Sequence, residues 1–144
     1  MMINSLLLVE DEDMFHLIFE DACYLLRIAM QLRMVKTSDE ADVMFRDWKV
    51  DPTDKPDCVF VDFNLVGSSY DGVDLVRRIN QIHGNGVVIG VISSSFDPAE
   101  IQRAKDCGAQ FWLVKTEDLE PRLEAFMGDY DSYKLPNFTF RVYQ

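Results

Sequence analysis

Polar side chains that could do chemistry together follow apolar runs at four separate points of the sequence. They are two acids after the first run, then a third acid, a hydroxyl group and an ammonium group: Glu10, Asp11, Asp62, Ser93 and Lys115. If the apolar runs are parallel strands of one sheet, their carboxyl ends meet at one edge, which is where open α/β sheets bind ligands. The sequence therefore predicts a site that combines three carboxylates with one hydroxyl and one ammonium.

The charges of such a site indicate which ligands it would hold. Three neighbouring carboxylates repel one another, and in an empty site the pKa of at least one of them would rise. A hard divalent cation relieves this repulsion, and Mg²⁺ is commonly held by one or two carboxylates plus phosphate. Lys115 adds positive charge and Ser93 a hydrogen-bond donor, so the set suits a phosphoryl group. A central carboxylate could itself be the nucleophile and become an aspartyl phosphate.

The elements that must position these residues alternate along the chain. Strands are expected at 6–9, 32–36, 58–61, 87–92 and 111–114, and helical patterns lie near 15–29, 38–48, 72–79, 98–107 and 118–127. Four of the five strands are continuously apolar, as strands buried on both faces are. Capping residues mark helix starts at Thr37 and Asp97, and Gly108 is expected to end the fourth helix. Five βα units imply a parallel sheet with helices on both faces.

Composition excludes several classes of function. The 144 residues include 14 Lys or Arg and 25 Asp or Glu, a formal charge of −11. Nucleic acid and anionic membrane surfaces are therefore not expected as direct partners, because their phosphates would be repelled. No apolar run approaches the length of a membrane span, and the N-terminus lacks the basic start of a signal peptide.

Histidines and cysteines give no sign of a second site. His16 and His83 lie away from the expected strand ends, so we expect helix or surface residues rather than ligands. The three cysteines are scattered and form no Cys-x-x-Cys motif. Reduced structural thiols are typical of a cytosolic protein, so a cytoplasmic location is expected.

The length suggests one domain, which we place at residues 1–127, followed by a C-terminal tail at 128–144. The end of the tail, 137–144, alternates like a strand. Three interpretations remain open for it. It could pack on the domain, it could form an edge that pairs with a partner or a second subunit, or it could be a frayed terminus.

In this order, the motifs resemble the receiver domain of two-component response regulators, over about residues 4–127. The matching motifs are Glu10-Asp11 after Leu7-Leu8-Val9, Asp62 in Val59–Leu65, Asp71-Gly72, Ser93 after Val91-Ile92, and Cys107-Gly108-Ala109 leading to Leu113-Val114-Lys115. Each motif is weak alone, but together they are specific. The resemblance implies a flavodoxin-like, doubly wound parallel sheet of five strands in the order 2-1-3-4-5, with five helices.

The resemblance also implies a role for each matching residue. Asp62 would accept a phosphoryl group from a histidine kinase or a histidine phosphotransfer protein. Glu10, Asp11 and Asp62 would hold Mg²⁺, with the backbone carbonyl of Asn64 as a further ligand. Lys115 would pair with the phosphoryl group. Such a chain is a signalling protein rather than a turnover enzyme.

A switch is implied as well. Ser93 would move toward the phosphoryl group, and Trp112 occupies the aromatic switch position of the family. Their coupled movement would reshape the face formed by the fourth helix, fifth strand and fifth helix, which then binds or releases a protein target. The sequence does not identify this target, and a homodimer is possible.

The chain departs from the family pattern at several positions. Thr116 follows Lys115 where the family usually has Pro and a cis peptide bond. A cis bond before Thr would cost about 3–4 kcal/mol, so we expect a different loop shape there. Trp112 replaces the commoner Tyr or Phe, and its larger indole is expected to resist turning inward. The loop from Asp62 to Gly72 is longer than usual and lacks the usual Pro.

Two other functions compete with this interpretation. A degenerate receiver would bind partners without being phosphorylated, although all five chemical residues are present. A phosphatase of the haloacid dehalogenase type would use Asp62-Phe63-Asn64 as its nucleophile motif. That motif normally follows the first strand, and its second Asp is a general acid, a role that Asn64 cannot fill. A flavodoxin is excluded, because no Ser/Thr/Gly-rich phosphate loop follows the first strand.

Overall fold

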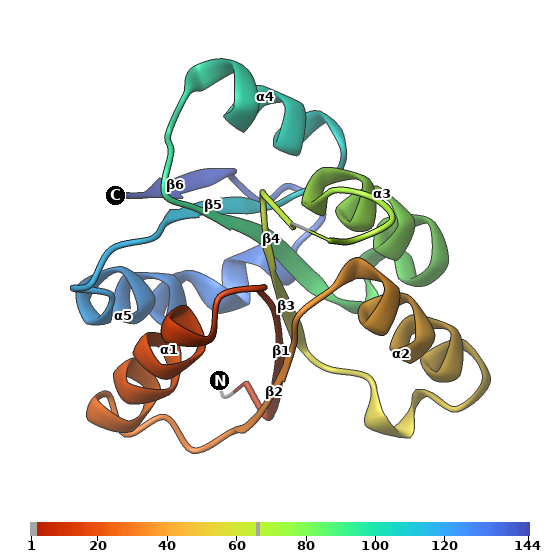
Figure 1. Cartoon of the computed structure of the whole chain (residues 1–144), viewed down its shortest axis with the longest axis horizontal. Coiled ribbons are helices and arrows are strands. Elements are labelled where there is room, and N and C mark those ends of the chain that lie inside the picture. Colours follow the sequence, from red (N-terminus) through yellow and green to blue (C-terminus); the bar gives the residue numbers. More distant parts are fainter. Residues whose placement is uncertain (1–2, 66) are drawn as a thin grey trace.

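A computed structural model of the protein describes residues 3–65 and 67–144 (Figure 1). Met1 and Met2 of the predicted domain, and Val66 of the predicted loop after the third strand, lie outside the described residues. Within the described part, six parallel strands form one sheet in the order β2-β1-β3-β4-β5-β6. They are β1 (Ser5–Val9), β2 (Gln31–Val35), β3 (Cys58–Asp62), β4 (Val88–Ser93), β5 (Phe111–Val114) and β6 (Arg141–Tyr143).

Helices cover both faces of the sheet. The α-helices are α1 (Asp13–Leu25), α2 (Ser38–Val50), α3 (Gly72–His83), α4 (Pro98–Asp106) and α5 (Glu120–Asp129), with 3-10 turns η1 (Pro52–Asp54), η2 (Gly84–Gly86) and η3 (Tyr130–Lys134). α1 and α5 lie on one face, and α2, α3 and α4 on the other (Figure 1). The predicted doubly wound α/β fold is therefore confirmed. None of the described helices is long and apolar enough to cross a membrane.

The central strands are apolar on both sides because each side faces a separate layer of helices. In β1, Leu7 and Val9 pack in the cluster that α2, α3 and α4 cover, whereas Leu6 and Leu8 pack in the cluster under α1 and α5. All four side chains are fully buried. Successive side chains point to opposite faces of a strand, so a strand between two cores must be apolar throughout.

The local signals that mark helix ends are used as expected. The Thr37 hydroxyl accepts a hydrogen bond from the Glu40 amide at 3.1 Å, and the Asp97 carboxylate accepts one from Ala99 at 3.3 Å. Gly108 follows α4 with φ at +104°, a conformation that favours glycine. These helix ends determine the length of the loops between strands and helices, and hence where the residues after each strand lie.

The predicted count of five strands is wrong, because β6 extends the sheet beyond β5. It pairs in parallel with β5, with Phe111, Trp112 and Leu113 opposite Arg141, Val142 and Tyr143. The alternation at 137–144 thus marks a strand that packs on the domain, as one of the three interpretations had it. With only three residues, the strand was too short to distinguish from a frayed end by its pattern alone.

Candidate functional site

Three carboxylates meet at the carboxyl ends of β1 and β3, as the sequence predicted. Glu10 directly follows β1, Asp11 comes next, and Asp62 is the last residue of β3. One carboxylate oxygen from each of the three lies within 4.8 Å of the other two. Glu10 is fully buried and Asp62 is 3% exposed, whereas Asp11 is partly exposed. Oxygen donors at this spacing fit a hard divalent cation.

Lys115 is the cation that balances these acids. Its Nζ lies 2.6 Å from Glu10 Oε2 and 3.5 Å from Asp62 Oδ1. It also lies 3.4 Å from Glu12 Oε1, an exposed carboxylate that the sequence analysis did not single out. Glu12 could have been suspected only from its place in the acidic run that follows β1.

Burial and mutual repulsion shift the ionisation of this group. Burial and the charge of Glu10 raise the pKa of Asp62 to about 8, against the opposing charge of Lys115. Burial also raises the pKa of Glu10, although the hydrogen bond with Lys115 works against it. Burial lowers the pKa of Lys115, but the hydrogen bond with Glu10 and the charges of both acids outweigh this and raise it. Without a metal, Asp62 therefore keeps a proton at neutral pH, because one lysine does not offset its burial and the charge of Glu10.

Asn64 and Ser93 complete the edge of the site. The Asn64 amide donates a hydrogen bond to Asp62 Oδ1 at 3.3 Å. Ser93 ends β4, next to β3, and is 1% exposed. Its hydroxyl oxygen accepts a hydrogen bond from the Ser95 amide at 3.1 Å, so its own proton is free to be donated.

The Asp71-Gly72 motif brings α3 against the backbone of the central acid. A Cβ atom added to Gly72 would lie 1.9 Å from the Asp62 carbonyl oxygen, so only glycine fits there. The Asp71 carboxylate accepts a hydrogen bond from the Asp74 amide at 2.9 Å and caps α3. It also pairs with Arg103 of α4 at 2.9 Å, which ties α4 to the same loop.

Trp112 is fully buried, contrary to the expectation that its indole would resist turning inward. Its Nε1–H donates to the Ser95 carbonyl at 2.9 Å, and its ring lies 5.4 Å from that of Phe63. A buried indole needs a partner for its N–H, and the loop after β4 provides one. Sequence alone could not place that carbonyl.

His16 is a helix residue, as expected, and lies in α1. Its Nε2 lies 2.7 Å from the Glu10 carbonyl oxygen, so it contacts the backbone beside the acids. His83, in contrast, contacts the Phe45 carbonyl at 3.3 Å and the Trp48 ring, away from the acids. All described peptide bonds are trans, including the one before Thr116.

The response regulator receiver domain family matches residues 6–126 of the chain. No curated protein matches it. Many solved structures match the chain. Those described below share so little sequence identity with it that the similarity concerns the fold alone.

Three of these structures cover nearly the whole chain. The phosphorylated cyanobacterial phytochrome response regulator RcpA is 19% identical with a TM-score of 0.73, over 91% of this chain and 94% of its own. A response regulator from Thermotoga maritima is 22% identical with a TM-score of 0.67, over 88% and 99%. The Mn²⁺-bound form of the response regulator Rcp1 is 18% identical with a TM-score of 0.68, over 94% and 97%.

Proposed function

The chain belongs to the response regulator receiver domain family, and on that premise we propose that Asp62 accepts a phosphoryl group. The donor is a phosphohistidine of a histidine kinase or a histidine phosphotransfer protein. The observation that carries this proposal is the burial of Asp62 between Glu10 and Lys115, 3.5 Å from the lysine Nζ. Burying a carboxylate in this position costs free energy because the group loses its hydration. We therefore assign Asp62 a chemical rather than a structural role.

The acids would hold a divalent cation, and we propose Mg²⁺. The ligands are the carboxylates of Glu10, Asp11 and Asp62, with the Asn64 carbonyl as the further ligand of the family. Among similar structures, Rcp1 is Mn²⁺-bound, and a response regulator from Burkholderia pseudomallei has a phosphorylated aspartic acid and a calcium ion. When bound, the cation neutralises the oxygens of the transferring phosphoryl group.

The side chains of this chain then have distinct tasks. An oxygen of Asp62 would form the new bond to phosphorus while the bond from phosphorus to the donor nitrogen breaks. The imidazole leaves with that electron pair and is neutral, because its other ring nitrogen already carries a proton. Lys115, now shared among three carboxylates, exchanges one of them for a phosphoryl oxygen. The Ser93 hydroxyl, which already accepts a hydrogen bond from the Ser95 amide, would donate a hydrogen bond to another phosphoryl oxygen.

The product of this reaction is the phosphorylated chain itself, and no metabolite is released from it as a product. We propose that the phosphorylated chain acts in the cytoplasm by binding or releasing a protein target, and that it does not turn over a substrate. A phosphatase of the haloacid dehalogenase type is less compatible with the site, because Asp62 ends the third strand rather than the first and Asn64 stands where that class has its general acid.

An assay with two phosphate compounds separates the three functions. The chain is incubated with Mg²⁺ and either a small acyl phosphate or an aryl phosphate, and bound and released phosphate are measured. We expect one phosphoryl group retained per chain from the acyl phosphate and no repeated hydrolysis of the aryl phosphate. Asp62→Ala should retain none, whereas Asp21→Asn, an exposed acid of α1, should behave as the wild type. Steady hydrolysis of the aryl phosphate would indicate the phosphatase. If a folded chain that binds Mg²⁺ retains no phosphoryl group, the result would indicate the degenerate receiver.

A further inference from the structure

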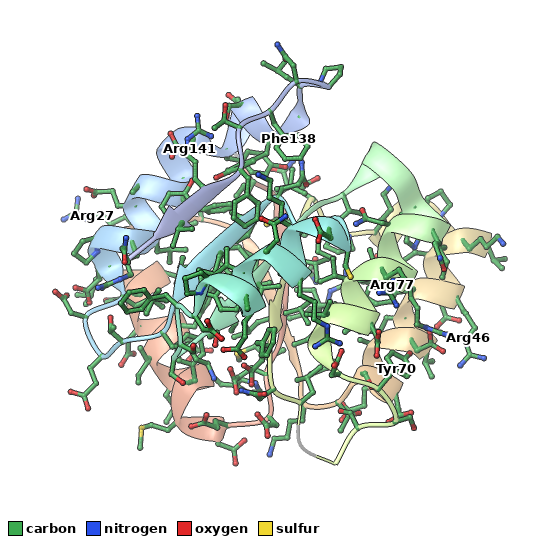
Figure 2. The ribbon with its side chains drawn as sticks, turned by 90° about the horizontal axis from the view of Figure 1, so that it is seen from above. Arg27, Arg46, Tyr70, Arg77, Phe138 and Arg141 are labelled. Carbon is green, nitrogen blue, oxygen red and sulfur yellow. The ribbon has the colours of Figure 1, made fainter. Side chains whose placement is uncertain are left out.

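The C-terminal strand covers the edge of β5, the element on which the family's partner face was expected to centre. Figure 1 shows β6 running beside β5, and three residue pairs join them. Figure 2 shows Arg141 and Phe138 together on this segment, across the molecule from Arg46 and Tyr70. The outer surface here is therefore formed by β6, and the edge of β5 is not free.

One side of β6 packs next to the switch residue. Val142 lies opposite Trp112 in the strand register, and both belong to the same apolar cluster, together with Phe140. The other side of β6 faces α5 and η3. There the Tyr143 hydroxyl donates to Asp129 at 2.8 Å, and Arg141 donates to the Ser132 hydroxyl at 3.1 Å.

A continuous set of contacts joins β6 to the phosphoryl site. The Ser93 hydroxyl accepts from the Ser95 amide at 3.1 Å, and the Ser95 carbonyl accepts from the Trp112 indole at 2.9 Å. Trp112 is in turn flanked by Val142 on the neighbouring strand. Ser93 is thus connected to β6 through Ser95 and the indole ring of Trp112.

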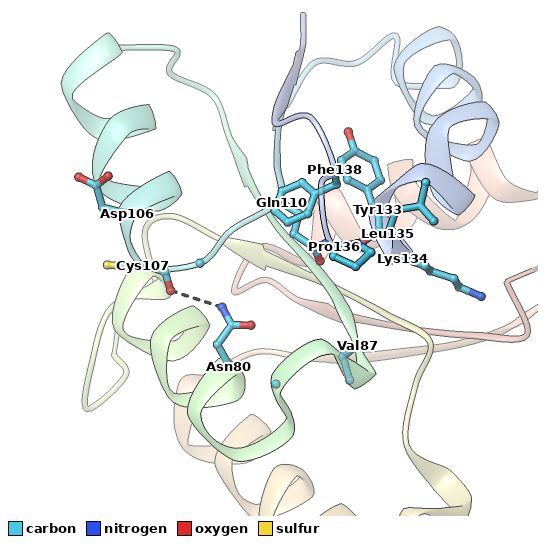
Figure 3. Close-up of a pocket in the computed structure, with 12 residues that line it drawn as sticks. Asn80, Val87, Asp106, Cys107, Gln110, Tyr133, Lys134, Leu135, Pro136 and Phe138 are labelled. Carbon is cyan, nitrogen blue, oxygen red and sulfur yellow. Dashed lines mark hydrogen bonds between the residues drawn. The ribbon is translucent and has the colours of Figure 1, made fainter.

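A cavity of about 460 Å³ borders the segment that leads into β6, at the end of the sheet where β4 and β5 begin (Figure 3). Tyr133, Leu135, Pro136 and Phe138 line it on one side, and Asn80 and Cys107 on the other. A three-residue edge strand after such a loop is the kind of element that opens locally without unfolding the domain.

We propose that docking of β6 on β5 is coupled to the phosphoryl site, so that each stabilises the other. Docked β6 closes the space beside Trp112 and keeps its indole on the Ser95 carbonyl, which holds the loop that follows Ser93. A phosphoryl group that accepts a hydrogen bond from the Ser93 hydroxyl fixes the start of the same loop and so favours the docked strand. Such coupling is reciprocal. The inference rests on the proposed phosphorylation of Asp62 and extends it to the C-terminal segment.

The test compares two valine truncations. Val142→Ala removes the contact beside Trp112, and Val43→Ala, at an exposed position of α2, is the matched control. Affinity for beryllofluoride with Mg²⁺, a mimic of the phosphoryl group, is measured by titration. We expect Val142→Ala to weaken it by about fivefold and Val43→Ala to leave it nearly unchanged. If Val142→Ala folds poorly, Val142→Thr, which keeps the shape but places a hydroxyl beside Trp112, takes its place and should also bind beryllofluoride more weakly than the wild type.

Amide hydrogen exchange of the wild type gives the reciprocal measurement. Beryllofluoride with Mg²⁺ should slow exchange in residues 141–143, with the amides of β3 as the reference for global stability. Unchanged exchange at 141–143 in a protein that binds beryllofluoride, or equal effects of the two alanine variants, would overturn the coupling and leave the proposed function intact. Failure of the wild type to bind beryllofluoride would instead overturn both.

Discussion

At the scale of single residues, the site is defined by a carboxylate that is difficult to ionise. Asp62 is nearly inaccessible, and burial together with the charge of Glu10 raises its pKa to about 8. The ordinary value is 3.8, which we take for the unfolded chain. Between these two values the metal-free folded protein holds a proton that the unfolded chain has released, so its stability falls as the pH rises.

Removing this charge should therefore stabilise the metal-free protein. We expect Asp62→Asn to raise the free energy of unfolding by at least about 1 kcal/mol at pH 8, because one unit of pKa corresponds to about 1.4 kcal/mol. The advantage should be small near pH 4, grow up to pH 8 and then level off. Chemical denaturation in the presence of a chelator measures it, with Asp21→Asn as the control. A variant that is less stable than the wild type at pH 8 would refute this account of Asp62.

Most of the site could be predicted from residue types at strand ends. Glu10, Asp11, Asp62 and Lys115 come together because parallel strands end at one edge, and that rule needs only the strand positions. The inward position of Trp112 could not be predicted, since it depends on a carbonyl in another loop.

At the scale of elements, α2 and α3 are joined by an ion pair in which the acid is buried and the arginine is half exposed. The Asp42 carboxylate, 8% exposed, accepts from Arg78 at 2.8 Å and lies 3.0 Å from Arg46. Burial alone would raise the pKa of Asp42, but hydrogen bonds from Arg78 and Tyr70 and the two arginine charges lower it overall. This link is therefore present at neutral pH and is lost as the pH falls below 3.8 toward the lower folded pKa.

Breaking this link should destabilise the fold in a pH-dependent way. We expect Asp42→Asn to lower the free energy of unfolding at pH 7 by about 1–2 kcal/mol, because the buried carboxylate loses its charge-assisted hydrogen bond with Arg78. The deficit should shrink as the acid is titrated in the wild type. Asp74→Asn, which breaks a more exposed pair with Arg77 on α3, should change stability by less than about 1 kcal/mol. Similar losses in the two variants would argue against a special role for the buried acid.

The elements themselves show where prediction from sequence succeeds. The strands with two apolar faces and the capped helices were found because their signals are local, as at Thr37 and Asp97. The strand β6 was left among three alternatives because its three residues gain their stability from Phe111, Trp112 and Leu113, far away in sequence.

At the scale of the whole molecule, the formal charge of −11 sets how anions approach the site. Asp11, Glu12 and Asp13, which are partly or fully exposed, follow the buried Glu10, and a small acyl phosphate is itself an anion. Like charges repel, and salt screens the repulsion over a Debye length of about 10 Å at 0.1 M. A protein donor would need a complementary, basic docking surface to overcome the same field.

The rate of phosphorylation by a small anionic donor should therefore increase with salt. We expect the second-order rate constant for an acyl phosphate, at saturating Mg²⁺, to rise by about twofold or more between 20 and 200 mM monovalent salt. Stopped-flow measurement of Trp fluorescence follows the reaction, and the exposed Asp13→Asn should reduce the salt dependence. A rate that falls with salt would mean that local positive charge, rather than the net charge, governs the encounter.

The central claim is that Asp62 is the residue that carries the phosphoryl group, and reductive trapping tests it most directly. The chain is phosphorylated with an acyl phosphate and Mg²⁺ and treated with borohydride, which reduces an aspartyl phosphate to homoserine, and its peptides are then sequenced by mass spectrometry. We predict homoserine at position 62, dependent on Mg²⁺, and unmodified acid at Glu10, Asp11 and Glu12. Homoserine at any other aspartate, or none in a chain that has retained phosphate, would contradict the account.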